Sequence, residues 1–409
     1  MRKNYLFLGF GIPDEEMKQV FESDRFPAVQ THKFNWNLIK GLENYDFADF
    51  TYISARPVSD YPFYPRKKIS GNVWRSQILD SEIRIREIPY LNTSLLKIIT
   101  RTLSGLYYSV KEYHQKPNKG GIIVYSVHVP FMLIGFLLSR FYKIDFIGIW
   151  TDPPSVISQR EGFLKSHLRN LELRISKALM SRVTKVIALT KFLAEDFAPG
   201  KPYLVVEGII DEQDANRLSS SEKQRKDRDI VRVVYTGSIA KRYGIQNIVE
   251  AFTLLENKNI ILEVYGCGDY EDELRQICLK NKNIKYYGFV PNEKALRAQR
   301  EADFLINARS ADDYYVKYSF PSKTLEYMLS GTPLITTILP GMPEDYRDFV
   351  IVLEDSSPRT ISETLQKASE LSVHERRKIG INALEFAKTK DFRTQGEQIA
   401  NFILNEFRH

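Results

Sequence analysis

Short apolar runs alternate along the chain with stretches of helical periodicity. Most of these runs are continuous rather than alternately apolar and polar, as is typical of parallel strands that helices cover on both faces. The pattern predicts an α/β fold with strands at residues 5–11, 50–55, 121–127, 144–150, 184–190, 203–208, 231–237, 260–266, 284–290, 303–308, 334–337 and 349–354.

The polar stretch EQDANRLSSSEKQRKDRD, residues 212–229, has neither helical nor strand periodicity. Because it divides the strands into two sets, we expect two doubly wound, Rossmann-like domains joined by a linker or surface excursion. The predicted boundaries are residues 1–206 for the first domain, 207–388 for the second and 389–409 for an amphipathic terminal helix. In doubly wound sheets, ligands bind beyond the carboxyl ends of the strands. The loops at those ends are therefore where functional residues are expected.

One helix of the second half has clear boundaries within YSFPSKTLEYMLSG, residues 318–331. Pro321 suits a first helical turn, and Ser319 or Ser322 is expected to cap the free amides there. Gly331 suits the left-handed position after a helix, and Pro333 prevents its continuation. The pattern thus predicts a loop, a helix and a strand in succession.

The start of this helix places a cation, Lys323, beside backbone amides that have no helical partners. Such an end attracts anions, because the amides and the helix dipole are both positive there. Glu326 lies one turn further on, where a carboxylate can accept two hydrogen bonds from a vicinal diol such as that of ribose. The alternative is an ordinary capped helix with both side chains in solvent.

Other loops at predicted strand ends carry residues that suit a nucleoside diphosphate. Lys241 and Arg242 are two cations that follow the strand at 231–237. Gly266 and Gly268, at the end of the strand at 260–266, permit close approach of a ligand to the backbone. Phe289 and Val290, at the end of the run 284–290, are an apolar pair. Solvated cations and a tight turn are the alternative explanations for the first two features. The candidate donor-binding residues are Gly237, Ser238, Lys241, Arg242, Gly266, Gly268, Phe289, Val290, Ser322, Lys323 and Glu326.

Composition excludes several other classes. The 409 residues are 43% hydrophobic and 27% charged, as in ordinary globular proteins, and two cysteines cannot form a disulfide framework or a cysteine-rich zinc site. The net charge of +7 is spread among acids without a finger motif or arginine-rich tail, so nucleic acid is not an expected partner. The longest apolar run, residues 129–138, is too short to span a bilayer, and acids follow the first strand too soon for a signal peptide. We expect a cytoplasmic location.

The motifs GSIAKRYGI, VYGCGD, YGFVP, ADFLINARS and EYMLSGTPLI occur in this order in the second half. Their order and spacing resemble the donor domain of GT-B-fold glycosyltransferases of the large retaining family four. The segment KYSFPSKTLEYMLSGTP is similar to the corresponding segment of enzymes that build bacterial capsular or exopolysaccharide repeat units. The resemblance covers roughly residues 203–390. It implies two domains facing each other across a cleft, with the acceptor on the first, the nucleotide sugar on the second, and the C-terminal helix crossing back to the first.

The chain departs from that family at three positions. Members carry two glutamates eight positions apart, of which Glu326 matches the second while Tyr318 stands at the first. Members also carry an arginine and a lysine that contact the diphosphate, where this chain has Ser238 and Tyr243. Retention and inversion of the sugar's configuration therefore both stay open.

In the first half, the resemblance assigns Gly9 and Gly11 to the acceptor side of the site. His128 and Asp152 follow predicted strands and are the candidate catalytic residues, because relatives place a histidine near the second position. A strand-end histidine bonded to backbone is the alternative for His128. An Asx turn before two prolines is the alternative for Asp152.

The leading hypothesis is transfer of a sugar from a nucleotide sugar to a glycan or polyprenyl-linked acceptor. The alternatives are a nucleotide-sugar epimerase or hydrolase of related fold, and a nucleotide-binding scaffold without catalysis. We expect no cofactor and no metal, since Lys323 with Lys241 or Arg242 would supply the positive charge at the diphosphate. Asp312 and Asp313 are adjacent acids that could suggest a metal site, but solvated loop residues are the simpler explanation.

Residues 93–112 place apolar side chains at helical spacing with basic residues between them. A helix that faces the core is the usual explanation. The alternative is an interfacial surface that contacts an anionic membrane at the inner face of the plasma membrane.

Overall fold

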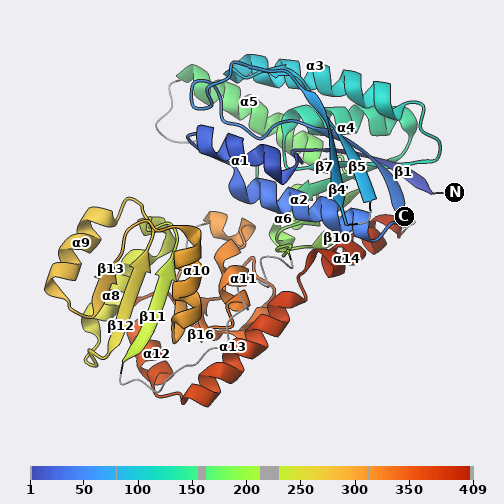
Figure 1. Ribbon diagram of the computed structural model, residues 1–409. Coiled ribbons are helices and arrows are strands. Elements are labelled where there is room, and N and C mark those ends of the chain that lie inside the picture. The colour runs from blue at the N-terminus through green and yellow to red at the C-terminus, as the bar shows by residue number, and fades with distance from the viewer. Residues whose placement is uncertain (1, 80, 155–162, 212–229, 312–313, 406–409) are drawn as a thin grey trace. The chain divides into compact units, whose positions relative to one another are not determined.

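The computed structural model describes residues 2–79, 81–154, 163–211, 230–311 and 314–405, and the chain divides into two units. The first unit contains residues 1–209 and 392–409, and the second contains residues 210–391. Figure 1 shows a sheet flanked by helices in each unit. The polar stretch at 212–229 and the Asp312–Asp313 pair lie outside the described residues.

The first unit is built on a sheet of eight described strands in the order β10-β9-β8-β7-β1-β2-β5-β4, which is parallel except for β4. Its strands are β1 (Lys3–Gly9), β2 (Ala48–Ser54), β4 (Asn72–Ile78), β5 (Ser81–Glu87), β7 (Lys119–Tyr125), β8 (Asp145–Trp150), β9 (Lys185–Ala188) and β10 (Tyr203–Val205), with a small separate pair β3 (Lys68–Ile69) and β6 (Tyr90–Leu91). The strand order reverses between β1 and β7. That reversal defines the point where doubly wound sheets bind ligands.

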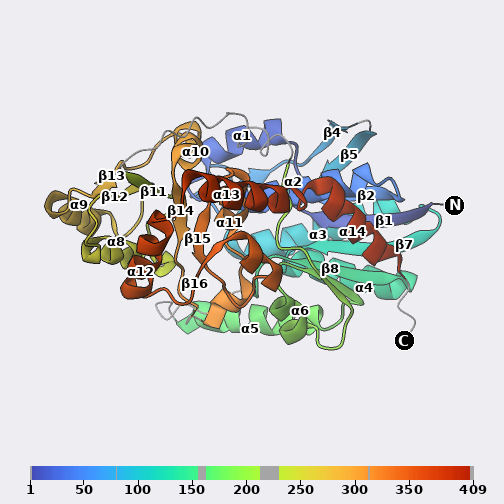
Figure 2. The same cartoon turned by 90° about the horizontal axis from the view of Figure 1, so that it is seen from below.

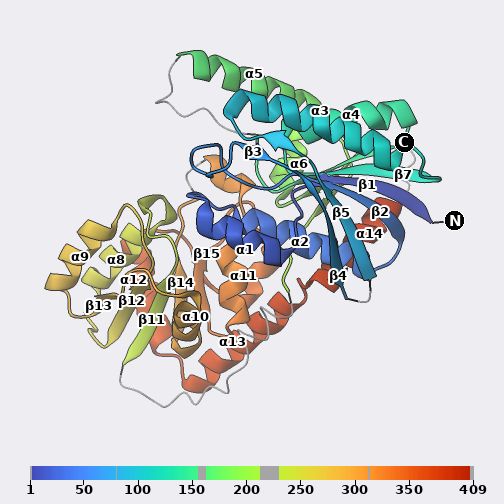
Figure 3. The ribbon, with the colours of Figure 1, turned by 45° about the horizontal axis from the view of Figure 1, so that its top comes forward.

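Two helical layers cover this sheet (Figure 3). One layer contains α3 (Ser94–Tyr113), α4 (Val129–Tyr142) and α5 (Phe163–Met180). The helices α1 (Asp14–Ser23), α2 (Val29–Asn44), α6 (Lys191–Phe197) and α14 (Phe392–Leu404) complete the unit. Among the described residues, every helix is too short or too polar to span a bilayer.

The second unit contains a parallel sheet of six described strands in the order β13-β12-β11-β14-β15-β16. The strands are β11 (Val231–Thr236), β12 (Ile260–Tyr265), β13 (Ile284–Tyr286), β14 (Phe304–Asn307), β15 (Leu334–Thr337) and β16 (Ile351–Leu353). Its helices include α8 (Ile245–Leu254), α9 (Glu271–Lys280), α10 (Asn292–Glu301), α11 (Ser322–Leu329), α12 (Pro358–Ser369) and α13 (Val373–Lys388), with short 3-10 turns at η1 (Lys241–Tyr243), η2 (Tyr314–Tyr318) and η3 (Glu344–Phe349). The order reverses between β11 and β14, as in a dinucleotide-binding fold. The expected α/β class with two doubly wound sheets is confirmed.

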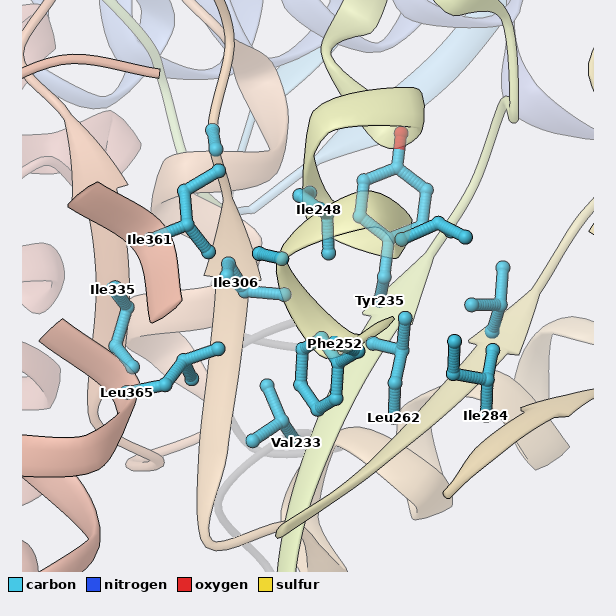
Figure 4. Packing of buried hydrophobic residues seen from close by; sticks show 14 of the residues in the cluster. Val233, Tyr235, Ile248, Phe252, Leu262, Ile284, Ile306, Ile335, Ile361 and Leu365 are labelled. Atoms are coloured by element: carbon cyan, nitrogen blue, oxygen red, sulfur yellow. The ribbon is translucent and has the colours of Figure 1, made fainter. Parts of the chain in front are cut away.

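The core of the second unit lies between this sheet and the helices α8 and α12 (Figure 4). Val233 and Ile306 on the strands and Phe252 on α8 are fully buried there. The Tyr235 ring belongs to the same cluster, and its hydroxyl lies at the carboxyl end of β11. Core packing therefore fixes the direction of a polar group at the strand end.

The sequence also determines where the last helices begin. The Ser357 side chain accepts a hydrogen bond from the Thr360 amide, and Pro358 occupies the first turn of α12. At α13, Ser372 and Glu375 form a reciprocal capping box. Both starts follow from side-chain chemistry that is visible in the sequence.

The terminal helix α14 packs on α2 through two glycines, Gly41 and Gly396 (Figure 2). A Cβ atom on Gly41 would collide with the carbonyl of Phe392, and one on Gly396 would lie 2.6 Å from the Gly41 Cα atom. Both obstacles are backbone, which cannot move aside as a side chain can. The helices therefore approach each other only because neither position carries a side chain.

Gly396→Ala should lower the stability of the first unit by about 1–3 kcal/mol, the usual cost of forcing a methyl group into a packed contact. Calorimetry or thermal circular dichroism should show a lower melting temperature. Gln398→Ala, an exposed position on the same helix, is the control and should leave it nearly unchanged. An unchanged melting temperature in Gly396→Ala would contradict the close contact.

Candidate functional site

The loops after β11 and β12 are in backbone contact. Gly237 and Gly266 have φ angles of 115° and 141°, which side-chain-bearing residues rarely adopt. The Gly237 amide donates to the Tyr265 carbonyl at 2.8 Å, and a Cβ atom on Gly266 would overlap the Gly237 carbonyl. Glycine is therefore required at both positions by the fold itself.

The contact continues along both loops. The Ile239 amide donates to the Cys267 carbonyl at 3.0 Å, and a Cβ atom on Gly268 would lie 2.7 Å from the Ile239 carbonyl carbon. Ser238 is exposed between these contacts, and its carbonyl accepts a hydrogen bond from the Tyr235 hydroxyl at 2.6 Å. The sequence predicted close approach of a ligand at Gly266 and Gly268, but the structure shows close approach of the neighbouring loop.

Lys323, in the first turn of α11, lies against Gly237. A Cβ atom on Gly237 would collide with the end of this lysine side chain. The ammonium group donates to the Tyr235 hydroxyl at 3.1 Å and lies 4.3 Å from the centre of that ring. Loss of hydration lowers the pKa of Lys323 to about 8, and the negative charge of Glu326 acts in the opposite direction.

Buried hydrogen bonds hold α11 and α10 to the end of β11. The Tyr327 hydroxyl accepts from the Thr236 amide at 2.8 Å and donates to the Thr236 carbonyl at 3.0 Å. The Gln299 amide group donates to the Glu326 carboxylate at 2.7 Å and to the Thr236 hydroxyl at 2.8 Å. Glu326 is half-buried. The structure thus brings Glu326 and Lys323 together at the end of one strand.

The start of α11 differs from the expectation in its cap. Pro321 occupies the capping position, and no side chain caps the helix there. The predicted caps were Ser319 and Ser322, but the Ser319 hydroxyl donates instead to the Val316 carbonyl, and exposed Ser322 is the first helical residue. Ser319 lies two residues before the capping position and Ser322 one residue after it, and both are poorly placed to reach the free amides. Those amides are therefore left without a side-chain acceptor.

The two other cations expected at the diphosphate, Lys241 and Arg242, contact other groups in the structure. Lys241 pairs with Glu273, and its backbone amide donates to Asp269. The exposed Arg242 guanidinium lies 4.9 Å from the centre of the neighbouring Tyr243 ring. The contact of these two residues with a phosphate stays a prediction.

Arg309 is a cation that the sequence interpretation missed. It follows β14, the strand next to β11, and its guanidinium lies 5.4 Å from the centre of the Tyr243 ring. Gly244 holds the two loops together, since a Cβ atom there would overlap the Ala308 carbonyl. The signal was present in ADFLINARS, where an arginine comes directly after a buried strand at the reversal of strand order.

Phe289 and Val290 follow β13 at the same edge of the sheet. Phe289 is largely exposed, whereas Val290 is half-buried. The preceding residue, Gly288, has a φ of 72°, and its carbonyl accepts from the Gly266 amide at 2.8 Å. An exposed aromatic side chain beside free loop backbone suits a planar ring such as a base.

Tyr318, at the position where relatives carry a glutamate, is buried. Its hydroxyl lies 2.9 Å from that of Tyr314. The position is therefore part of an aromatic pair in this chain and supplies no carboxylate.

In the first unit, Gly9 and Gly11 are buried beneath α2. A Cβ atom on Gly9 would lie 2.8 Å from the Phe7 ring, and one on Gly11 would lie 2.9 Å from the Asn35 side-chain oxygen. Both glycines are explained by internal packing. Their expected contact with an acceptor stays a prediction.

His128 follows β7 at the reversal of strand order in the first unit. Its Nε2 atom lies 3.4 Å from the Arg101 guanidinium, and its ring makes edge contacts with Phe10 and Phe131. Burial lowers the pKa of His128 well below its usual value, and the positive charges of Arg101 and Lys97 add to this shift. The imidazole is therefore neutral at neutral pH.

Asp152 is exposed and accepts a hydrogen bond from the Thr151 hydroxyl at 2.9 Å. Among the residues that the structure describes, no hydrogen bond joins it to His128. The two candidates thus occupy neighbouring strand ends, β7 and β8, as separate groups.

The described residues contain no cluster of three or more histidine, cysteine or acidic side chains that could hold a metal. Cys267 and Cys278 are both free thiols.

Residues 216–386 match the family model described as glycosyl transferases group 1. This stretch contains β11 to α12, most of α13 and the strand-end loops of the second unit described above. This part of the chain is therefore similar to glycosyl transferases group 1, and the expected enzyme class, a glycosyltransferase, is confirmed. Among curated proteins, none matches the chain in sequence.

Several solved structures share the fold over almost the whole chain. HepE from Anabaena, solved with UDP, has a TM-score of 0.60 at 14% identity and covers 98% of this chain and 99% of its own. Sucrose-phosphate synthase from Thermosynechococcus elongatus has a TM-score of 0.64 at 14% identity, with 98% of each chain covered. A UDP-forming trehalose-phosphate synthase from Burkholderia xenovorans has a TM-score of 0.64 at 9% identity, covering 98% of this chain and 100% of its own. At such identities these similarities show the fold.

The geometry predicts that the affinity for an anion depends on pH through Lys323. Inorganic pyrophosphate should bind with full affinity while the ammonium is charged, and more weakly as the pH rises above about 8. Calorimetric titrations between pH 7 and 10 measure this dependence. The Lys323→Arg variant remains protonated and serves as the control, because pyrophosphate itself titrates in both proteins. Identical pH profiles for the two proteins would contradict a role for Lys323.

Proposed function

We propose that the chain transfers a glycosyl group from a nucleotide sugar to a glycan or polyprenyl-linked acceptor. The observation that carries the proposal is the position of Lys323, a cation of lowered pKa against Gly237 at the reversal of strand order. A desolvated ammonium group gains more from an anion than an exposed one does, because little water screens it. The group 1 domain match supports a diphosphate-linked sugar as that anion.

Uridine nucleotides are the first donors to test. The structural neighbours include HepE with UDP-glucose and a trehalose-phosphate synthase that forms UDP. In our proposal, the diphosphate lies at Lys323 and the free amides of α11, and the base lies at Phe289. The ribose diol is assigned to Glu326, whose other contact, Gln299, holds the carboxylate in place.

In this mechanism, Lys323 stabilises the charge that develops on the leaving diphosphate. Charge-assisted hydrogen bonds of this kind contribute about 1.5–3 kcal/mol each. As the diphosphate departs, its negative charge favours the protonated lysine and so raises the pKa of Lys323. The interaction therefore strengthens in the transition state, as catalysis requires.

Two roles stay open for the residues of the first unit. If the sugar keeps its configuration, a donor phosphate oxygen accepts the acceptor proton and Asp152 positions the sugar. If the configuration inverts, Asp152 is the general base, and its loss lowers the rate by roughly 10²–10⁴. His128 is neutral and is proposed to contact the sugar rather than to act as a cation. The anomeric configuration of the product, measured by NMR, distinguishes the two mechanisms.

The biological setting that we propose is assembly of a bacterial surface polysaccharide at the cytoplasmic side of the membrane. Acceptor dependence is the test of transfer. UDP release that requires an acceptor supports a transferase, whereas release without one supports a hydrolase. Tight binding of donors without turnover supports a scaffold.

Glu326→Gln should weaken UDP binding by about 1.5–3 kcal/mol, because the neutral amide accepts hydrogen bonds less strongly and repels one of the two ribose donors. Isothermal titration measures the change. Glu354→Gln, an exposed position in the same unit, is the control and should bind UDP normally. Unchanged UDP affinity in Glu326→Gln would remove this residue from the site.

Transfer should continue in excess chelator, because in our proposal Lys323 and the free amides of α11 supply the positive charge at the diphosphate. Lys323→Ala should lose most of the activity under the same conditions, whereas Lys241→Ala, whose ammonium is paired with Glu273, should lose less. Loss of activity in chelator that magnesium or manganese restores would overturn the metal-independent mechanism.

A further inference from the structure

The helix α3 is amphipathic in the opposite sense to an ordinary surface helix. Its buried stripe consists of Arg101, Gly105, Ser109 and Tyr113, spaced four residues apart. Its exposed stripe is apolar and consists of Leu96, Ile99, Leu103, Tyr107 and Val110. A surface helix normally buries the apolar stripe and exposes the polar one.

Specific contacts account for the buried stripe. The Arg101 guanidinium donates to the Tyr90 hydroxyl at 2.8 Å and to the Arg56 carbonyl at 3.0 Å. Gly105 allows α4 to approach, since a Cβ atom there would lie 2.8 Å from the Ile134 side chain. Rotation of the helix to bury its apolar stripe would therefore break these hydrogen bonds, leave their buried partners without a donor and lose the close contact with α4.

The neighbouring helices α4 and α5 extend the apolar surface. In the same layer, α4 exposes Leu137 and Phe141, and the described part of α5 exposes Leu171 and Ile175 (Figures 1 and 3). Leu103 and Phe141 are 65% and 70% exposed. Several exposed apolar side chains on each of three neighbouring helices are unusual for a protein that contacts only water.

The helices of this layer carry an excess of positive charge. The three helices contain eight lysines and arginines and two glutamates, a net of +6. Two of these cations do not belong to the outer face, since Arg101 is buried and Lys97 is paired with Asp60 at 2.7 Å. One of those glutamates, Glu112, is paired with Arg86 at 2.6 Å. Lys111, Arg140, Arg174 and Lys177 are exposed around the apolar side chains. Apolar side chains surrounded by basic ones match the interface of an anionic bilayer.

We propose that the outer face of α3, α4 and α5 docks on an anionic lipid bilayer, with the apolar side chains in the interface and the basic residues on the lipid headgroups. This surface lies in the first unit, and the proposal does not depend on the chemistry assigned to the second unit. It resolves the two explanations of residues 93–112, because these apolar side chains do not face the core.

The test is flotation of the intact protein with vesicles of phosphatidylcholine alone or mixed with phosphatidylglycerol. The protein should float with the anionic vesicles at low salt and much less at about 1 M salt, where charges are screened beyond about 3 Å. Leu103→Ser combined with Phe141→Ser should reduce the bound fraction at least tenfold. Both positions are exposed, so the melting temperature should stay the same.

Four further variants separate the contributions. Leu254→Ser combined with Leu279→Ser removes exposed leucines from the second unit and should leave flotation unchanged. Lys111→Gln and Arg140→Gln should each weaken binding about fivefold, the equivalent of about 1 kcal/mol for a basic residue near an anionic surface. In the Leu103→Trp variant, the tryptophan fluorescence should shift to shorter wavelength when anionic vesicles are added.

The proposal is overturned if the protein does not float with anionic vesicles at low salt. It is also overturned if the Leu103 and Phe141 variant floats as well as the parent protein. A dimer that this variant disrupts, without flotation of either protein, would assign the surface to a second copy of the chain instead. Since flotation requires no turnover, its result is independent of whether the chain transfers sugar.

Discussion

The backbone contact between Gly237 and Gly266 is the constraint on which the candidate site depends. It joins the loops after β11 and β12 at a distance that excludes any side chain. Because Gly237 has no side chain, the end of the Lys323 side chain can lie directly against its backbone. A side chain at Gly237 would remove the lysine from this position, and one at Gly266 would separate the two loops. Thr236, at the end of the same strand, binds Tyr327 and Gln299 and so fixes α11 and Glu326.

The desolvated position of the Lys323 ammonium lowers the stability of the folded chain. The pKa of Lys323 is about 10.5 in the unfolded chain and about 8 in the folded chain. Between these values the free energy of unfolding attributable to this group rises with pH, and below pH 8 the charged lysine lowers it. An anion beside the ammonium removes that penalty. Perturbed groups of this kind are concentrated at functional sites, which is the reason for assigning the diphosphate here.

Much of the fold was predictable from the chain, because buried parallel strands are continuous apolar runs. The helix end at Gly331, with a φ of 63°, follows from the sequence pattern before Pro333. The hairpin of β4 and β5 was missed because neither strand contains a long apolar run. β4, at the edge of the sheet, is mostly polar, and β5 alternates charged and apolar residues. For α3, the period of the apolar residues predicted a helix. The buried side could not be predicted, since the polar stripe has the same period and is buried through contacts with distant residues.

The candidate site was predictable in part. Lys323 and Glu326 could be found because a helix start after a strand end has a recognisable pattern, and the structure places both at the end of β11. The pairing of Lys241 with Glu273 was not predictable, because the partner belongs to another helix 32 positions away. Arg309 was missed because its importance comes from strand order, which brings β14 beside β11.

A crystal structure of the intact chain with UDP tests the central claim most directly. The account predicts a diphosphate oxygen within hydrogen-bond distance of Lys323 Nζ, ribose hydroxyls on the Glu326 carboxylate, and the base beside Phe289. A nucleotide bound elsewhere, with the Lys323 ammonium in contact only with Tyr235, would contradict it.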